Sequence, residues 1–117
     1  MKTILIADDS ASMRKLLETI LLGEGYGVLT ADDGRQALKL AFDNQIDAIV
    51  ADEQMPGLTG TELFKILNTD PEKRSIPRIM ISGHSEHEQA TSELYDVFIS
   101  KNLDLKEQLL AAIDKIL

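Results

Sequence analysis

Apolar residues follow two patterns along this chain: short, nearly continuous runs, and longer stretches in which they return every three or four positions. The clearest short run, from Ile46 to Ala51, is apolar at almost every position and leads directly into Asp52. A strand that is apolar on both faces belongs in the middle of a parallel sheet covered by helices. By the same signals the predicted strands are Thr3–Ala7, Gly27–Ala31, the run into Asp52, Arg78–Ser82 and Asp96–Ser100.

Between these runs, the apolar residues have the spacing of amphipathic helices. The first helix is carried by Met13, Leu16, Leu17, Ile20 and Leu21, and a glycine-rich stretch then stops it. Further helices are predicted over Arg35–Asn44, Thr61–Asn68 and Asp104–Ile116. A short helix is also expected between about Glu86 and Leu94, where the sequence is polar and offers few residues to anchor it.

Strands alternate with helices throughout, which predicts a doubly wound α/β fold, a five-stranded parallel sheet with helices on both faces. The chain of 117 residues is long enough to bury a real core, and we assign residues 1–117 to one domain.

The chain is acidic, with a formal net charge of -8. This argues against direct binding to nucleic acid or to an anionic membrane surface, since both need clustered lysine and arginine. Cysteine is absent, which excludes disulfides and thiol chemistry. The opening residues lack the apolar core of a signal peptide, and no apolar run is long enough to span a membrane. We therefore expect a cytoplasmic protein without membrane insertion.

Polar side chains capable of chemistry stand where the predicted strands end. Asp8 and Asp9 follow the first strand, Asp52 ends the third, Ser82 ends the fourth and Lys101 follows the fifth. The carboxyl ends of parallel strands meet at one edge of the sheet, so these groups are expected to converge. For the acids to meet, the first and third strands must be neighbours.

Such a cluster suits a divalent cation and a phosphoryl group. Carboxylates that are brought together repel one another, and Mg²⁺, which takes oxygen ligands and keeps several waters, relieves that repulsion. Lys101 would pair with Asp52 or with a phosphoryl group, and the Ser82 hydroxyl would hydrogen-bond a phosphoryl oxygen. Taken alone, the Asp8–Asp9 pair could equally be an N-cap of the first helix. Lys101 taken alone would usually be a solvated residue at a strand end. Together these residues favour phosphoryl transfer to a carboxylate.

The chain resembles the receiver domain of response regulators over essentially its whole length. The motifs ILIADDS, ADDG, the apolar strand into Asp52 followed by MPG, IMIS and FISK stand in the order and spacing of that family. The resemblance implies a flavodoxin-like sheet of strand order 2-1-3-4-5. It also implies that Asp52 is the phosphoacceptor. Mg²⁺ would be held by Asp52, by Asp9 directly, by Asp8 through water and by the backbone carbonyl of Gln54.

The resemblance assigns roles to further residues. Lys101 and Ser82 match the family's lysine and hydroxyl. Phe98 matches the family's aromatic switch position, and Ser82 would take part in the same switch. Phe98 taken alone is equally a core residue. Gln54 and His84 match two variable positions that tune hydrolysis of the phosphoryl group, because a side chain there positions or excludes the attacking water. Unchanged dephosphorylation after replacement of both by alanine would contradict this hypothesis.

The implied partners are a sensor histidine kinase or histidine phosphotransfer protein as phosphodonor and a downstream protein target, with the chain a monomer or weak dimer. It would catalyse its own phosphorylation and dephosphorylation and turn over no external substrate. One alternative is a receiver-like interaction module that works without phosphorylation. The other is a small aspartate-based phosphohydrolase, which is disfavoured because Gln54 stands where such enzymes carry a second acid.

Two departures from the family pattern fall near the end of the chain. Asn102 stands after the lysine in place of the usual proline, so a cis peptide there would cost about 2.5–4 kcal/mol. Ser82 and Lys101 are only 19 positions apart, and Leu94–Tyr95 replaces the usual Gly-Ala pair. We therefore expect the fourth helix to be short or irregular and its surface mobile. Strong amide protection throughout Glu86–Leu94 would contradict this.

Overall fold

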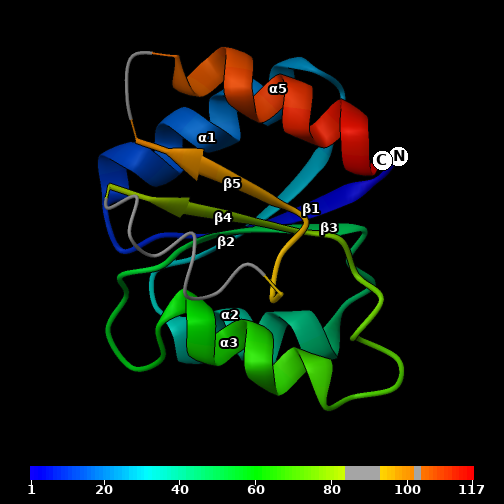
Figure 1. Cartoon of the computed structure of the whole chain (residues 1–117). Coiled ribbons are helices and arrows are strands. Elements are labelled where there is room, and N and C mark those ends of the chain that lie inside the picture. The colour runs from blue at the N-terminus through cyan, green and yellow to red at the C-terminus, as the bar shows by residue number, and fades with distance from the viewer. Residues whose placement is uncertain (84–92, 102–103) are drawn as a thin grey trace.

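The computed structural model describes residues 1–83, 93–101 and 104–117, and it contains a single parallel sheet covered by helices (Figure 1). The elements are β1 Thr3–Ala7, α1 Ala11–Gly23, β2 Gly27–Ala31, α2 Gly34–Asp43, β3 Ala48–Asp52, α3 Gly60–Asn68, β4 Arg78–Ser82, β5 Val97–Ser100 and α5 Leu105–Ile116. The five strands lie in the order β2-β1-β3-β4-β5 and every pair is parallel. The predicted doubly wound fold and its strand order are confirmed.

The expected fourth helix falls largely outside the described residues. Only its end is covered, and there Glu93 lies in a turn and Leu94 in a bend. His84, Asn102 and the peptide bond between Lys101 and Asn102 also lie outside the described residues. The predictions about these positions therefore stay predictions.

The sheet separates two apolar layers. Helices α1 and α5 cover one face and α2 and α3 cover the other (Figure 1). Ile4, Ile6 and Val50 belong to the layer of α1 and α5, whereas Leu5 and Ile49 belong to the layer of α2 and α3. Because successive side chains of a strand point to opposite faces, β1 and β3 are buried on both sides, as their continuous apolar sequence predicts.

Side-chain caps set the starts of three helices at the carboxyl edge of the sheet. The Ser10 hydroxyl accepts the backbone N–H of Met13, and the Asp33 carboxylate accepts that of Gln36. Thr59 and Glu62 form a capping box at the start of α3. Since these caps lie in the loops that follow β1, β2 and β3, they also order the loops around the strand ends.

Gly60 allows the start of α3 to lie directly against the end of β3. A Cβ atom on Gly60 would lie 2.7 Å from the backbone oxygen of Asp52 and 3.0 Å from Sδ of Met80. The Gly60 N–H also donates to the backbone oxygen of Glu53 over 2.9 Å. The position requires glycine because of this close approach.

Replacing Gly60 with alanine is expected to lower the free energy of unfolding by about 1–3 kcal/mol, because α3 must move away from the Asp52 backbone. Denaturation in urea measures the change. Gly23→Ala is the matched control: Gly23 is also helical, but a Cβ atom there meets nothing within 4 Å among the described residues. The control should be neutral or stabilising by up to about 1 kcal/mol. Equal losses in the two variants would contradict the steric explanation.

Arg78, at the start of β4, is a buried cation at the opposite edge of the sheet. It is 3% exposed, and its guanidinium stacks on the Phe64 ring, 5.6 Å from the centroid. Its NH groups donate to the side-chain oxygen of Asn68 and to four backbone carbonyls, those of Phe64, Lys73, Arg74 and Leu94. Burial lowers the pKa of Arg78, and the charge of Asp96 opposes that effect. Arg78 thus joins α3, the connector before β4 and the segment before β5.

Candidate functional site

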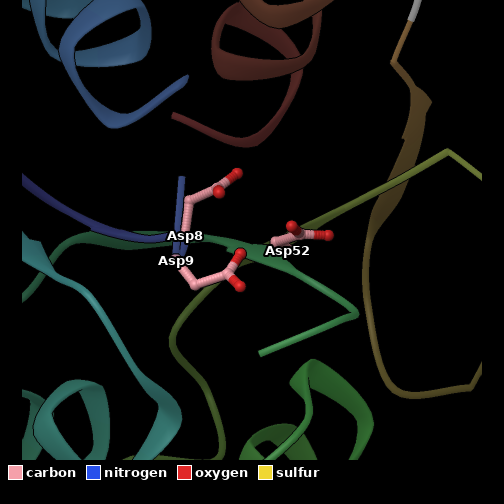
Figure 2. A group of neighbouring side chains, drawn as sticks. All are labelled: Asp8, Asp9 and Asp52. Carbon is pink, nitrogen blue, oxygen red and sulfur yellow. The ribbon is translucent and has the colours of Figure 1, made fainter. Parts of the chain in front are cut away.

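Three carboxylates meet at the carboxyl edge of the sheet (Figure 2). Asp8 and Asp9 follow β1, and Asp52 is the last residue of β3, the strand that pairs with β1. One oxygen from each lies within 4.8 Å of the others. Asp8 and Asp52 are 1% and 5% exposed, whereas Asp9 is exposed. The topology therefore brings the predicted acids together, with Asp9 on the solvent side.

Lys101 neutralises the two buried acids from the end of β5. Its Nζ atom lies 2.8 Å from Oδ2 of Asp52 and 3.4 Å from Oδ2 of Asp8. Because β4 lies between β3 and β5, the lysine side chain reaches across one strand to make these contacts. With all four groups ionised, the cluster of three acids and one lysine keeps an excess of negative charge.

Burial has opposite consequences for the two kinds of charge. Desolvation raises the pKa of Asp8, and the charge of Asp52 raises it further. The backbone hydrogen bond from Ser10 and the charge of Lys101 act to lower this pKa, but the net shift is upward. For Lys101, desolvation acts to lower the pKa, but the hydrogen bond and charge of Asp52, with Asp8, outweigh it and raise the pKa. Lys101 therefore stays cationic at neutral pH, while Asp8 holds a proton more readily than a free aspartate.

The donor set fits a hard divalent cation. Oδ2 of Asp8 is buried and, among the described residues, accepts no hydrogen bond; its ion-pair partner is Lys101. Asp9 and Gln54 line one hollow of about 450 Å³ together with Glu53, Met55 and Thr59. An unsatisfied buried carboxylate oxygen beside two further carboxylates and an open hollow is an arrangement suited to Mg²⁺, which combines protein oxygens with water.

The backbone after β3 also contacts the central acid. The N–H of Gln54 donates to Oδ1 of Asp52 over 3.2 Å, and Lys101 donates to Oδ2. Gln54 itself is exposed at the hollow. The carboxylate is thus held in one orientation.

Ser82 and Phe98, two further predicted site residues, lie on the strands nearest Lys101. Ser82 is fully buried at the end of β4, and its backbone oxygen accepts the N–H of Lys101 over 3.0 Å. Phe98 is half-buried in β5, where it packs on the layer of α2 and α3, with its ring centroid 5.8 Å from that of Tyr95. The structure thus places Ser82 next to the β5 end that carries Lys101, while Phe98 lies farther back along that strand.

Glu53 is a buried acid beside the site that the sequence analysis did not single out. It follows Asp52 directly, is 7% exposed, and contacts Thr61 at the start of α3. The sequence does contain a signal for this contact: Glu53 directly follows a predicted buried strand, and the hydroxyl of Thr61 stands eight positions later at a predicted helix start.

A family model described as the response regulator receiver domain matches residues 4–114. This chain belongs to that family. Receiver domains of response regulators are signalling proteins of two-component systems rather than classical enzymes, and they interact with histidine kinases and downstream targets.

Individual receiver proteins are similar to this domain in sequence and structure. The chemotaxis protein CheY of Pseudomonas aeruginosa is 32% identical over 87 residues, which cover 74% of this chain and 70% of that protein. The structure of CheY4 of Vibrio cholerae has a TM-score of 0.91 and 31% identity, with 100% and 99% of the two chains covered. Response regulator TrrA of Thermotoga maritima, solved in complex with Mg²⁺-BeF, has a TM-score of 0.90 and 32% identity over the full length of both chains.

The described helices of the receiver domain include none that is long and apolar enough to cross a membrane.

Magnesium is expected to stabilise the domain more at neutral than at acidic pH. The pKa of Asp8 is raised on folding, so its proton-linked contribution to stability is present at low pH and is lost as the pH rises through the folded-state pKa. Mg²⁺ binds the deprotonated acids and should add about 2.7 kcal/mol at a concentration of about 100 times its dissociation constant. Urea denaturation at about pH 4 and pH 7, with and without Mg²⁺, measures both effects.

Asp8→Asn should flatten the pH dependence and weaken the stabilisation by Mg²⁺, because the amide still accepts the N–H of Ser10 but carries no charge. Asp114→Asn, at an exposed position of α5, is the control and should behave as the unchanged protein. Equal stabilisation by Mg²⁺ at both pH values would contradict the assignment of the metal site to Asp8 and the neighbouring acids.

Proposed function

We propose that this receiver domain accepts a phosphoryl group on Asp52, with Mg²⁺ bound at the acidic cluster, and relays a signal through protein contacts. The donor is a phosphohistidine on a sensor histidine kinase or a histidine phosphotransfer protein. The observation that carries the proposal is the setting of Asp52: one oxygen is held by the Gln54 N–H and the other by Lys101, beside Asp8 and Asp9. The domain acts as a monomer or weak dimer and turns over no external substrate.

In the transfer, an oxygen of Asp52 attacks the phosphorus atom and the bond from phosphorus to the histidine nitrogen breaks. The electron pair of that bond stays on the imidazole, which takes up a proton, and Asp52 becomes an acyl phosphate. Lys101, already within 2.8 Å of Asp52, pairs with the incoming phosphoryl oxygens, and the Ser82 hydroxyl donates to one of them. Such transfers depend mainly on positioning and charge neutralisation.

Asp9 would bind the metal directly, Asp8 through a water, and Asp52 and the backbone carbonyl of Gln54 would complete the protein ligands. Mg²⁺, when bound, would neutralise negative charge that builds up on the phosphoryl oxygens. Oδ2 of Asp8, which is buried and accepts no hydrogen bond among the described residues, and the hollow beside Asp9 support this assignment. The solved complex of TrrA with Mg²⁺-BeF supports it from a relative.

Gln54 and His84 would set the lifetime of the phosphoryl group. The exposed position of Gln54 at the hollow, next to the acid, supports its part in this role. Replacing Gln54 by alanine should change the rate of dephosphorylation severalfold by altering the position of the attacking water. Loss of the phosphoryl adduct with time, followed by intact mass, measures this rate. The hypothesis fails if neither Gln54→Ala nor His84→Ala changes it.

Ser82 and Phe98 would report the phosphorylated state to partners. Ser82 ends β4 beside Lys101, and Phe98 on the neighbouring strand β5 is half-buried, so its ring contacts both the interior and solvent. Phosphorylation should therefore shift the NMR signals of the Phe98 ring. Unchanged signals in a fully phosphorylated sample would remove Phe98 from this role.

Incubation with Mg²⁺ and a small phosphodonor such as acetyl phosphate tests the function. Intact mass should show one phosphoryl adduct, which is absent when the metal is chelated. Hydroxylamine should remove the adduct, since it cleaves acyl phosphates and leaves phosphoserine intact. No adduct under any condition would instead favour an interaction module that works without phosphorylation.

A further inference from the structure

Glu53 lies on the α2 and α3 side of the acidic site, where it lines the same hollow as Asp9 and Gln54. Alternation along β3 places Ala48 and Val50 in the layer of α1 and α5, and Ile49 and Ala51 in the layer of α2 and α3. Glu53 continues the second series and contacts α3. Its carboxylate is therefore next to Asp52 in the chain but directed toward another layer.

Three hydrogen bonds join Glu53 to the start of α3. The Thr61 hydroxyl donates to Oε2 of Glu53, and the Thr61 N–H donates to Oε1 over 3.5 Å. From the backbone side, Gly60 N–H donates to the Glu53 carbonyl over 2.9 Å. The carboxylate thus accepts two donors from one residue in the first turn of α3, where helical N–H groups need outside acceptors.

These contacts close the loop of residues 54–59 at both of its ends. Within that loop, Gln54 donates its N–H to Asp52, and Gln54 and Thr59 line the hollow beside Asp9. A loop whose ends are fixed has fewer conformations, so its backbone groups keep their direction toward the cluster. Outer partners that hydrogen-bond a metal ligand directly commonly change metal affinity by about 10–100-fold when they are removed, and Glu53 acts one step further out, through the loop that carries Gln54.

We propose that Glu53 is a positioning residue for the metal and phosphoryl site, acting through its hydrogen bonds to Thr61 rather than through its charge. This inference rests on the proposed function of the acidic cluster. Glu53 touches neither the reacting atoms nor the metal in this role; it holds the backbone of residues 54–59 in place. A side-chain amide at position 53 that forms two equivalent hydrogen bonds with Thr61 should therefore preserve the site.

The test compares Glu53→Ala, which removes both bonds, with Glu53→Gln, which removes only the charge. In Glu53→Gln the amide oxygen still accepts the Thr61 N–H, and the amide NH₂ donates to the Thr61 hydroxyl. Mg²⁺ affinity is measured by NMR titration of unphosphorylated protein, following the Gln54 amide signal. Glu53→Ala should weaken Mg²⁺ binding by about tenfold or more, whereas Glu53→Gln should stay within about twofold.

Thr61→Val, which lacks the hydroxyl but keeps the N–H, should give a smaller loss of affinity, and Thr61→Ser should restore it. These variants keep the test decisive if Glu53→Ala does not fold. Asp70→Ala is the control for general destabilisation: Asp70 accepts two backbone N–H groups, from Glu72 and Lys73, in the connector after α3, away from the site. It should lower stability without changing Mg²⁺ affinity.

Two results would overturn the inference while leaving the proposed function intact. The first is unchanged Mg²⁺ affinity in both Glu53→Ala and Thr61→Val. The second is an equal loss in Glu53→Gln and Glu53→Ala, which would mean that the charge acts. If the unchanged protein binds no Mg²⁺ and takes no phosphoryl group, the proposed function and this inference fail together.

Discussion

Asp52→Asn is expected to abolish the phosphoryl adduct completely. The asparagine has nearly the same size, and its oxygen still accepts the N–H of Gln54, but the amide lacks the anionic oxygen that attacks phosphorus. Asp52 accepts a hydrogen bond on each of its two oxygens, whereas Oδ2 of Asp8 accepts none among the described residues. Intact mass after incubation with Mg²⁺ and acetyl phosphate measures the loss.

The control for this variant is Asp43→Asn, at an exposed position near the end of α2, where the partner is the exposed Lys39. It should form the adduct as the unchanged protein does. Circular dichroism should show that both variants are folded. An adduct of undiminished yield in Asp52→Asn would place phosphorylation on another residue and overturn the assignment of the acceptor.

Arg78→Ala is expected to lower the free energy of unfolding by at least about 3 kcal/mol. The substitution removes the donor from several carbonyls around a buried position, and each buried polar group left without a partner costs about 1–3 kcal/mol. The contact with the Phe64 ring is also lost. Denaturation in urea measures the change, and phosphorylation of the fraction that stays folded should persist because Arg78 lies at the opposite edge of the sheet.

Arg74→Ala gives the matched comparison, because Arg74 is exposed and only four positions away. Its effect should lie within about 0.5 kcal/mol, as for most surface substitutions. A similarly small effect in Arg78→Ala would mean that water replaces the guanidinium among these carbonyls, and that the buried network contributes little to stability.

The main features of the fold and the acidic cluster are predictable from the sequence for a topological reason. A parallel sheet places the carboxyl ends of all its strands at one edge, so Asp8, Asp52 and Lys101 had to converge once β1 and β3 were neighbours. The strand bounds of β1, β2 and β4 agree with the prediction, because continuous apolar runs mark them clearly. Receiver-family motifs supplied the strand order.

Element boundaries and buried charges depend on contacts that spacing does not reveal. Helices α2 and α3 each start one residue earlier than predicted, at Gly34 and Gly60, because Asp33 and Thr59 cap them there. Burial of Glu53 and Arg78 depends on partners on other elements, such as Thr61 and Phe64. A charged residue in a sequence is expected to be exposed until such partners are known.

The reach of Lys101 across β4 gives the sheet a mechanical property. The strand β5 is an edge strand of four residues, hydrogen-bonded within the sheet to β4 only, yet the lysine that follows it is tied to the ends of β3 and β1. A change in charge on Asp52 therefore alters the force on an edge strand that has only one neighbouring strand to hold it in place. We expect β5 to be the first element to move when the charge on Asp52 changes, so that a chemical change on the central strand alters the position of an edge strand.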